Sequence, residues 1–342
     1  MRIVFMGTPE FAVPTLNRIA GSVDHAVVAV YTRPDRPAGR ALRLRPSPVK
    51  EAALRLGLRI EQPERLRGPA AEDMVLDLTS HGAEAIVVVA YGLIIPQRIF
   101  DAPPYGTVNL HPSLLPRHRG AAPIERAILA GDARTGVTTM RIDAGIDTGA
   151  ILEQQDVPIL PHETSGELRT RLAELGAELV MSTLAALGAG HLVARPQTSG
   201  EETYAEKVGK ADCALDFSGS AEQVARIVRA LSPEPGACCL LVRGAGAGTA
   251  PAASARPLRV KLLRATAGAP VPPAGAALPG TIVRADSKGS DLVVACGDGR
   301  TVVVTALQPE GKRPQDGGSF VRGYRVGRGD QFVSLASEAS HA

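Results

Sequence analysis

Three polar residues, Asn109, His111 and Asp147, have the types and the spacing of a site for acyl transfer to an amine. Asn109 and His111 end a short β-prone run, because the prolines that follow allow neither a strand nor a helix to continue. Asp147 lies in a loop after a second predicted strand, over residues 136–142. Ligands of open α/β sheets bind outside the carboxyl ends of the strands, so we expect the three side chains to meet there.

Each of these side chains has a role in that chemistry. The amide of Asn109 can donate to an oxygen that gains negative charge in a tetrahedral intermediate. His111 can exchange a proton near neutral pH, or stabilise that oxygen as an imidazolium. Asp147 can orient the imidazole, raise its pKa and help to remove a proton from the attacking amine. No covalent nucleophile is required if the acyl donor is already activated.

A simpler interpretation of both patterns stays open at this point. A single histidine in a loop is more often a surface or hydrogen-bonding residue than a catalyst. The Asp-Thr-Gly run at 147–149 is also a good turn sequence, in which the aspartate satisfies backbone donors. The spacing alone does not decide between the two interpretations, so the longer strings around these residues matter.

Those strings resemble the folate-dependent formyltransferases. The runs at 109–124 and 145–149 carry this resemblance. Further strings, in the same order, resemble the members of the family that formylate methionyl initiator tRNA: residues 6–12, 34–40, 46–50, 88–96, 203–207, 297–299 and 307–309. The similarity extends from residue 2 to about residue 310, which is nearly the whole chain.

The resemblance implies the reaction and its substrates. The donor would be 10-formyltetrahydrofolate, and the acceptor would be the α-amine of methionyl initiator tRNA. Asn109, His111 and Asp147 would be the catalytic residues, and no metal would be needed. The resemblance also implies folate contacts from a segment directly after His111, made of Ser113, Leu114, Leu115 and Pro116.

The residues around Ala90 predict the wall of the donor pocket. Ala90 and Gly92 are small, so backbone can approach a flat heterocycle and read its edge with free N–H and C=O groups. An ordinary buried strand followed by a turn would not need this run. The predicted contacts are Ala90, Tyr91, Gly92 and Leu93.

A basic loop is predicted between residues 33 and 50. It holds six Lys or Arg residues and one acidic residue, and long loops in compact domains are usually functional or disordered. Arginines separated by apolar residues suit contact with an RNA end, although a solvated flexible loop explains the composition as well. The resemblance favours RNA, because the corresponding loop enters the acceptor stem of initiator tRNA. The predicted tRNA contacts are Arg36, Arg40, Arg43, Arg45 and Lys207.

The arrangement of strands and helices predicts two domains. Residues 1–190 alternate strands and helices, which indicates a Rossmann-like, mostly parallel sheet with helices on both faces. Residues 191–210 are polar and are predicted to be a linker. Residues 211–342 contain a helix at 221–231 and five short strands separated by turn residues, which suits a small β-barrel; the resemblance implies an OB-like, tRNA-binding domain. Two Ala/Gly/Pro-rich segments, 244–257 and 265–279, are predicted to be hairpin loops.

Composition excludes several classes of protein. No apolar run approaches the ~18 residues of a membrane helix, and the first residues enter a strand directly, without the features of a signal peptide; the cytoplasm is the expected location. The four cysteines form no C-x-x-C pair and share no ligand spacing with histidines, so a metal site is not expected. Residues 211–342 carry 15 basic against 11 acidic residues, a modest indication of a polyanionic partner.

Alternative functions remain at this point. A formyltransferase that acts on a sugar nucleotide or on glycinamide ribonucleotide would share the chemistry but would not need the basic loop. A hydrolase of formyl-folate would release formate without any amine. A binding module for RNA or folate with an inactive site is the non-enzymatic alternative, and the presence of all three catalytic residues argues against it.

Overall fold

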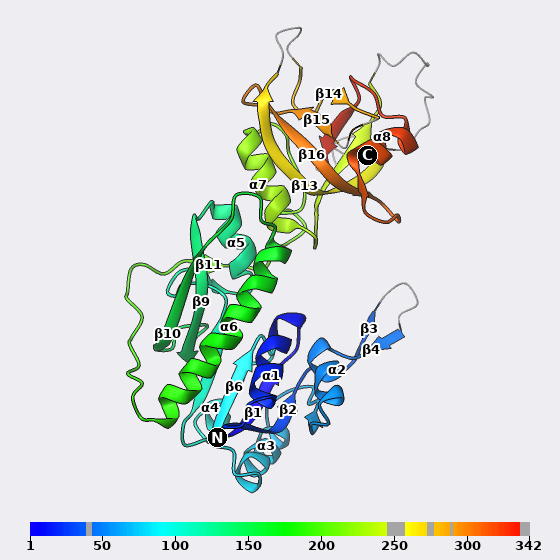
Figure 1. Cartoon of the computed structure of the whole chain (residues 1–342). Helices are drawn as coiled ribbons and strands as arrows, with labels where there is room; N and C mark the ends of the chain where they lie inside the picture. The colour runs from blue at the N-terminus through cyan, green and yellow to red at the C-terminus, as the bar shows by residue number, and fades with distance from the viewer. Residues whose placement is uncertain (39–42, 245–256, 272–276, 288, 290, 336–342) are drawn as a thin grey trace. The chain divides into compact units, whose positions relative to one another are not determined.

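The computed structural model describes residues 1–38, 43–244, 257–271, 277–287, 289 and 291–335, and the chain forms two compact units (Figure 1). The N-terminal unit comprises Met1–Pro123, Arg134–Pro158 and Arg169–Glu206. The C-terminal unit comprises Ile124–Ala133, Ile159–Leu168 and Lys207–Ala342. Within the described ranges, no helix is both long and apolar enough to cross a bilayer.

The N-terminal unit is built on a seven-stranded sheet with the strand order β10-β9-β7-β6-β1-β2-β5. Its strands are β1 (Arg2–Gly7), β2 (Ala26–Tyr31), β5 (Ile60–Glu61), β6 (Ala85–Val89), β7 (Thr107–His111), β9 (Arg134–Arg141) and β10 (Ile151–Pro158). The strands from β7 to β5 are parallel. The prediction of a Rossmann-like, mostly parallel sheet is therefore confirmed.

One strand direction differs from the prediction. We expected residues 136–142 to extend the parallel array, but β9 runs antiparallel to β7, and β10 runs antiparallel to β9. Asn109 pairs with Met140 and His111 with Thr138, so the carboxyl end of β9 lies beside the amino end of β7. β9 is buried along most of its length, as the strands of a parallel sheet are, so the sequence did not reveal this reversal.

Helices cover both faces of the sheet. The helices and helical turns up to residue 188 are η1 (Glu10–Ala12), α1 (Val13–Ala20), α2 (Pro48–Arg55), α3 (Pro69–Ser80), α4 (Gln97–Phe100), α5 (Pro123–Ala130) and α6 (Ser165–Gly188). On one face, Met74 and Leu78 of α3 pack against Val4 and Met6 of β1. On the other face, Leu187 of α6 packs with Val108 of β7.

The helix boundaries follow local signals in the sequence. Ser47 followed by Pro48 predicts the start of a helix, and the hydroxyl of Ser47 caps α2 by accepting the backbone N–H of Lys50 at 3.0 Å, with Pro48 in the first turn. The sequence also predicts helices at 70–80, 123–130 and 164–187, which correspond to α3, α5 and α6.

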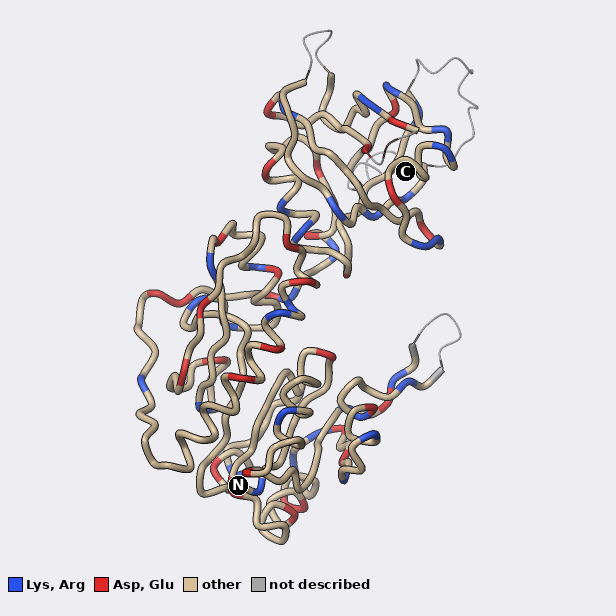
Figure 2. The backbone as a smooth tube through the Cα atoms, viewed as in Figure 1, with Lys and Arg blue, Asp and Glu red and all other residues tan. Residues whose placement is uncertain are grey.

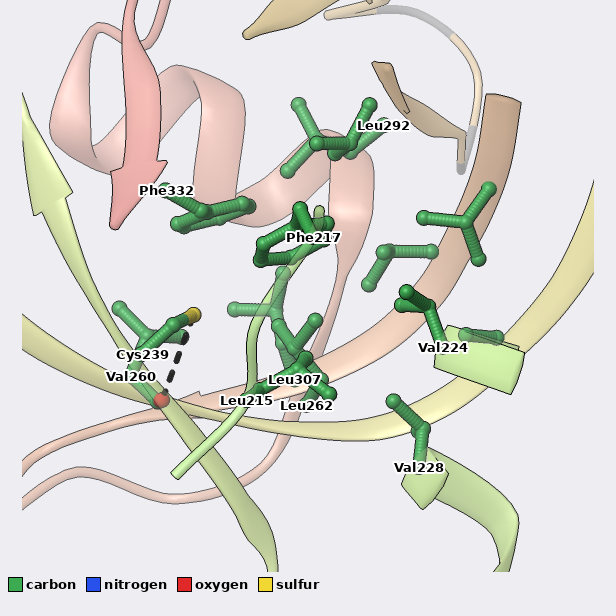
Figure 3. Packing of buried hydrophobic residues seen from close by; sticks show 14 of the residues in the cluster. Leu215, Phe217, Val224, Val228, Cys239, Val260, Leu262, Leu292, Leu307 and Phe332 are labelled. Atoms are coloured by element: carbon green, nitrogen blue, oxygen red, sulfur yellow. Dashed lines mark hydrogen bonds between the residues drawn. The ribbon is translucent and has the colours of Figure 1, made fainter. Parts of the chain in front are cut away.

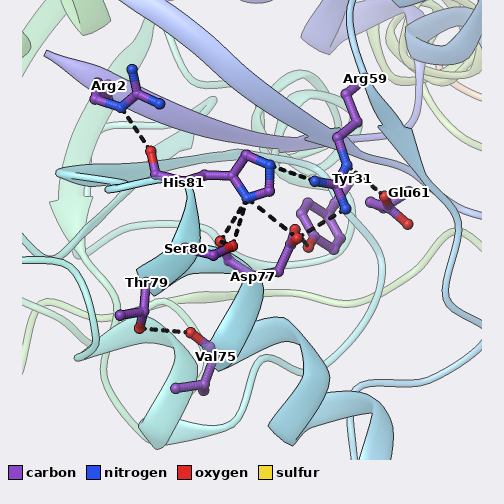
Figure 4. A network of polar contacts seen from close by, with 9 residues as sticks. All are labelled: Arg2, Tyr31, Arg59, Glu61, Val75, Asp77, Thr79, Ser80 and His81. Atoms are coloured by element: carbon purple, nitrogen blue, oxygen red, sulfur yellow. Dashed lines mark hydrogen bonds and ion pairs between the residues drawn. The ribbon is translucent and has the colours of Figure 1, made fainter.

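A polar network joins β5 to the end of α3 (Figure 4). Asp77 accepts the hydroxyl of Tyr31 at 2.7 Å and pairs with Arg59 at 2.9 Å. Arg59 also pairs with Glu61 and contacts the ring of His81. Two strands and a helix are thereby fixed to one another at this edge of the sheet.

The C-terminal unit contains a curled antiparallel sheet with the strand order β14-β15-β16-β13-β12-β18 and with β17 beside β16. The elements are α7 (Ala221–Leu231), β12 (Ala237–Val242), β13 (Leu258–Pro270), β14 (Ile282–Ala285), β15 (Leu292–Ala295), β16 (Arg300–Pro309), β17 (Gln315–Asp316), α8 (Gly317–Tyr324) and β18 (Gln331–Ser334). The first and last strands meet, because Ile282 donates to the carbonyl of Asp330 at 2.8 Å and Phe332 to that of Gly280 at 2.8 Å.

The core of this unit lies inside the curled sheet (Figure 3). Phe217 stacks on Phe332 with ring centroids 6.0 Å apart, and Val224 and Val228 of α7 close one side. The predicted helix at 221–231 and all five predicted strands are present. The interior is filled by side chains, as in small barrels.

Other expectations for this unit need correction. The segment 265–279 was expected to be a loop, but β13 continues through Pro270 and pairs with β16 up to Arg300. Helix α8 and strands β17 and β18 were not predicted. Residues 245–256 and 272–276 of the two expected loops lie outside the described residues.

The segment predicted as a linker, 191–210, is hydrogen-bonded to the N-terminal unit over much of its length. Arg195 exchanges two backbone hydrogen bonds of 2.8 Å with Ile151. Strand β11 (Tyr204–Ala205) pairs in parallel with β8 (Arg119–Gly120). The N-terminal unit accordingly extends to Glu206.

Replacing Asp330 by alanine is expected to lower the free energy of unfolding of the chain by about 3 kcal/mol, the scale for breaking a buried ion pair. Its carboxylate is 1% exposed and accepts from Arg243 at 2.7 Å and from the backbone of Gly244 and Gly327 at 3.1 and 2.9 Å. Urea unfolding of the full chain measures the change. The exposed Asp291 is the control, and its alanine variant should stay within about 1 kcal/mol of wild type; equal losses would contradict the prediction.

Candidate active site

Asn109 and His111 lie two residues apart on β7, so their side chains project from the same face of the sheet. The alternate residues, Val108 and Leu110, are buried on the opposite face, where α6 packs. β7 lies between β6 and β9, which holds both polar side chains on a rigid strand.

A pocket of about 490 Å³ opens over this face. Asn109 and Asp147 both line it. Its walls come from the end of β6 and the segment after it (residues 88 and 90–97) and from the end of β9 and the loop after it (residues 140–147), together with Phe100. A volume of this size suits a small organic ligand.

Asp147, which lines the pocket, pairs with the buried ring of His111. The Nδ1 atom of His111 lies 3.5 Å from Oδ2 of Asp147, and Nε2 lies 2.9 Å from the carbonyl oxygen of His118. A carbonyl oxygen only accepts, so Nε2 carries a hydrogen and donates it. The lone pair of the neutral ring is therefore on Nδ1, the atom that faces the Asp147 carboxylate, and His111 takes up a proton there.

Two opposing effects act on the pKa of His111. Asp147 was predicted to raise the pKa of the imidazole, and its carboxylate acts in that direction. Burial instead lowers the pKa of His111 below its ordinary value, although Asp147 and the hydrogen bond to His118 act in the opposite direction. Desolvation outweighs a carboxylate 3.5 Å away. The resting ring is neutral near neutral pH and is ready to accept a proton.

Asp147 reaches the pocket by a different route from the one predicted. The carboxyl end of β9 lies beside Val108, away from His111, so the loop after it must turn back over the sheet. Within that loop Asp143 accepts the N–H of Gly145 at 3.0 Å and the hydroxyl of Thr148 at 2.6 Å. Gly149 allows the return, because a Cβ there would stand 1.9 Å from the carbonyl oxygen of Arg141.

The backbone of Asp147 is in the left-handed region, with φ 53°. Aspartate tolerates this conformation better than most residues, at a cost of order 1 kcal/mol. Its Oδ2 accepts the N–H of Gly120 at 2.9 Å. The carboxylate is thus held between a backbone donor and the His111 ring.

The amide of Asn109 is available to a ligand. The residue is partly exposed, and none of the residues in the described ranges forms a hydrogen bond with its side chain. Its N–H groups are therefore free to donate to an oxygen bound in the pocket.

The predicted folate residues fall into two groups. Ala90, Tyr91, Gly92 and Leu93 all line the pocket. Ala90 and Gly92 have positive φ, 47° and 84°, and the hydroxyl of Thr8 donates to the carbonyl of Tyr91 at 2.7 Å. The ring of Tyr91 itself is buried in the core beside α3.

The second group, Ser113, Leu114, Leu115 and Pro116, is not part of the pocket wall. Ser113 is fully buried, and its hydroxyl donates to the carbonyl of Arg117 at 2.6 Å. The carbonyl groups of Ser113 and Leu115 accept from the side chains of Thr138 and Gln154. The polar groups of this segment are thus used within the protein.

Several residues at the site were not found from the sequence. The wall at 140–146, the backbone of Gly120 and the side chain of Gln197 are the main ones. The two strings 109–124 and 145–149 flank them, but no residue pattern pairs Gln197 with a loop 50 positions earlier. Among the described residues, no cluster of His, Cys, Asp or Glu is placed to hold a metal ion.

The predicted basic loop is partly a β-hairpin. β3 (Arg36–Ala38) pairs with β4 (Arg43–Arg45), and the chain between them, with Arg40, lies outside the described residues. Figure 2 marks the basic positions of the described part of this hairpin in blue along the backbone. Arg36 and Arg45 are exposed, and Leu44 beside Arg45 is 68% exposed. An apolar side chain thus stands among cations in the solvent.

The base of this hairpin is fixed, and one of its cations is neutralised there. Lys50 pairs with Asp35 at 2.7 Å, and Gln62 donates to Asp35 at 2.9 Å. Arg33 donates to the carbonyl of Gly92 in the pocket wall at 3.1 Å. The other predicted tRNA contact, Lys207, is exposed and belongs to the C-terminal unit.

Two family profiles match the chain. The family described as formyl transferase matches residues 1–184, and the one described as formyl transferase, C-terminal domain, matches residues 207–325. The two matches together cover most of the sequence.

Similar curated proteins span almost the full length. A methionyl-tRNA formyltransferase of Methylobacterium sp. (strain 4-46) is 46% identical over 333 residues, 97% of this chain and 99% of the relative. One from Paracoccus denitrificans is 46% identical over 323 residues, 94% of this chain and 97% of the relative.

Solved structures share the fold at low identity. An N-formyltransferase from Helicobacter canadensis, in complex with folinic acid and dTDP-3-aminofucose, has a TM-score of 0.58 at 16% identity, covering 88% of this chain and 98% of its own. HypX from Aquifex aeolicus, in complex with tetrahydrofolic acid, has a TM-score of 0.58 at 17% identity, covering 94% of this chain and 48% of its own.

Proposed function

This chain belongs to the formyl transferase family, and from that premise we propose that it transfers the formyl group of 10-formyltetrahydrofolate to the amino group of methionyl initiator tRNA. The product is N-formylmethionyl-tRNA, which serves translation initiation. The observation that carries the chemistry is that Asn109 and Asp147 line one pocket and that His111 pairs with Asp147 at 3.5 Å.

The pocket fits the donor. Its volume of about 490 Å³ suits a ring system, and Ala90 and Gly92 bring backbone to its wall. Residues 88–97 and 140–147 would hold the folate. When bound, the donor supplies a formyl carbon attached to a nitrogen that leaves, so the enzyme needs no nucleophile of its own.

The side chains then have these tasks. Asn109 donates an N–H to the formyl oxygen as that oxygen becomes negative during attack by the amine. His111 accepts at Nδ1 a proton from the attacking amine, which becomes more acidic as its bond to carbon forms. Asp147 stabilises the resulting imidazolium from 3.5 Å and holds the ring in position. The proton then passes to the departing nitrogen.

Similarity over nearly the whole chain supports methionyl initiator tRNA as the acceptor. The relatives that carry the tRNA name are 44–46% identical over 94–98% of the sequence, whereas the sugar-modifying structures share the fold alone. Residues 1–190 act as the catalytic domain, residues 191–210 as the linker and residues 211–342 as a tRNA-binding domain. Arg36, Arg40, Arg43, Arg45 and Lys207 contact the tRNA. The enzyme works in the cytoplasm, where this substrate is consumed.

A labelled-formyl assay tests the proposal. The full chain is incubated with radiolabelled 10-formyltetrahydrofolate and, separately, methionyl initiator tRNA, methionyl elongator tRNA, a dTDP-amino sugar or no amine. We expect label on the initiator tRNA. Label only on the sugar would change the acceptor class, and release of formate without an amine would indicate a hydrolase.

Removing two exposed arginines of the hairpin is expected to weaken tRNA use selectively. The double variant Arg36→Ala, Arg45→Ala should raise KM for the tRNA about tenfold and leave KM for the folate donor unchanged. Each lost phosphate contact should also reduce the slope of log KM against log salt by about 0.7–0.9. Steady-state kinetics from 50 to 200 mM salt measure both values.

Arg134→Ala is the matched control, because Arg134 is an exposed arginine at the start of β9 that pairs with Asp156. It should leave KM and the salt slope unchanged. If the double variant behaves like this control, the hairpin does not contact the tRNA.

A further inference from the structure

The segment of residues 195–205 crosses the N-terminal unit beside the catalytic loop. At its start, Arg195 pairs with Ile151, four positions after Asp147, through two backbone hydrogen bonds of 2.8 Å. At its end, β11 pairs with β8. This segment of eleven residues therefore contacts the chain shortly after Asp147, at Ile151, and shortly after His111, at β8.

Gln197, in the middle of this segment, forms four hydrogen bonds with its side-chain amide. Its Nε2 donates to the carbonyl of Asp147 at 2.8 Å and to that of Gly149 at 2.8 Å. Its Oε1 accepts from Nε and Nη2 of Arg119 at 3.0 and 2.7 Å. One side chain thus joins the loop that carries Asp147 to Arg119 of β8, the residue before Gly120.

The same segment also holds the backbone that contacts the catalytic pair. Thr203 accepts the N–H of His118 on its hydroxyl oxygen and that of Arg119 on its carbonyl, both at 2.8 Å. The carbonyl of His118 receives the hydrogen of His111, and the N–H of Gly120 binds the carboxylate of Asp147. Gly120 has φ 118°, and a Cβ there would meet the carbonyl of Ala205 at 2.9 Å.

The loop needs this support. Asp147 adopts a left-handed backbone, and the side-chain bonds within the loop are centred on Asp143, four residues earlier. The carbonyl groups of Asp147 and Gly149 both accept from Gln197. A displacement of about 1 Å at a catalytic group is enough to cost up to 10²-fold in rate.

We propose that the 195–205 segment is a positioning element of the active site and that Gln197 is the positioning residue for Asp147. It acts by donating both amide hydrogens to the carbonyls on either side of Thr148. This inference rests on the proposed function, because its kinetic test measures formyl transfer. It assigns to this segment, which the sequence predicts to be part of a linker, a role in catalysis beyond that of a connection.

A purely structural role for Gln197 would be to accept the hydrogen bonds of Arg119, which is buried. Two substitutions separate the roles. Gln197→Glu keeps an acceptor for Arg119 but directs an oxygen without a hydrogen at the two loop carbonyls. Gln197→Met keeps the size of the side chain and removes both sets of bonds. Positioning of Asp147 predicts that both variants lose activity, whereas a role limited to accepting the hydrogen bonds of Arg119 predicts that only Gln197→Met loses activity.

We expect kcat of both variants to fall about 10- to 100-fold, with KM for donor and tRNA within about twofold of wild type. Thr203→Val, which removes the acceptor for His118 and keeps the side-chain volume, should lower kcat by a smaller factor. Gln155→Met is the matched control, since Gln155 is exposed on β10. Wild-type kcat in Gln197→Glu, or an equal loss in Gln155→Met, would overturn the proposal.

A second readout does not depend on turnover. The His111 ring is followed by NMR in protein with labelled histidine, with His111→Ala identifying its signal. If Asp147 moves away in Gln197→Met, the titration midpoint of His111 should shift to lower pH, because the nearby carboxylate raises it in wild type. An unchanged midpoint would overturn the positioning proposal. If the wild-type protein transferred no formyl group, that outcome would count against the proposed function alone, because the titration does not depend on turnover.

Discussion

His111→Ala is expected to lower kcat by about 10²–10⁴, the usual scale for a positioned acid or base. The ring is buried on β7 and has its lone pair on Nδ1, beside Asp147. Alanine leaves no group to take the proton of the attacking amine at that point. Single-turnover formylation of methionyl tRNA measures the loss, and a circular dichroism spectrum like that of wild type shows that the fold is kept.

Asp147→Asn should produce a loss of the same order, because an amide does not stabilise an imidazolium and its NH₂ group would face the lone pair or the N–H of Gly120. The alanine variant of Asp143, which caps the same loop without touching His111, should lose less. Wild-type turnover in either His111→Ala or Asp147→Asn would reject the assignment of this pair.

The pH dependence follows from the direction of the His111 shift. As a base, His111 must be neutral, so kcat rises with pH through its pKa. Burial lowers the pKa of His111 below its ordinary value, so the acid limb should lie below the usual histidine range and activity should be full at neutral pH. Asp147→Asn removes a contribution that raises this pKa, so the acid limb of the pH profile of its residual activity should move to lower pH. An acid limb above pH 7 in wild type would contradict the neutral resting ring.

The sequence predicted the part of the site that depends on one strand and its ending. A β-prone run followed by prolines placed Asn109 and His111 at a strand end, and β7 ends at His111. Small residues after a buried strand placed the pocket wall at Ala90 and Gly92. Both inferences use only local patterns, which a single sequence contains.

The path of Asp147 could not be predicted in the same way. It depends on the direction of β9, which is set by the return of the chain after α5 and not by the composition of the strand. Once β9 is antiparallel to β7, the aspartate reaches His111 only through a loop that turns back. That loop depends on Asp143, Gly149 and Gln197, whose partners are fixed by tertiary structure.

Charge patterns were similarly incomplete. Six basic residues between 33 and 50 predicted an RNA contact, but sequence does not show that Lys50 is paired with Asp35 while Arg36 and Arg45 are exposed. The ends of this segment close on each other because Thr32 and Ser47 hydroxyls lie 2.7 Å apart. Pairing, and not composition, decides which cations face the solvent.

Asn109→Ala is expected to lower kcat by about 10²–10³, the effect of removing one donor from a developing oxyanion. The amide lines the pocket on β7 and, among the described residues, has no protein partner to satisfy. Removal of a hydrogen bond that forms only in the transition state lowers kcat and kcat/KM together. Steady-state kinetics at varied concentrations of the formyl donor distinguish this effect from a loss of substrate binding, which would raise KM at constant kcat.

Asn109→Asp sharpens the test, because it keeps the shape of the side chain and replaces its donor by a charge that repels the oxyanion. It should be at least as slow as Asn109→Ala. Asn17→Ala, at the other asparagine of the chain, exposed on α1, should match wild type. An aspartate variant that retains most of the wild-type kcat would mean that the formyl oxygen lies elsewhere, and the backbone N–H groups of the 88–97 wall would then be the donors to examine.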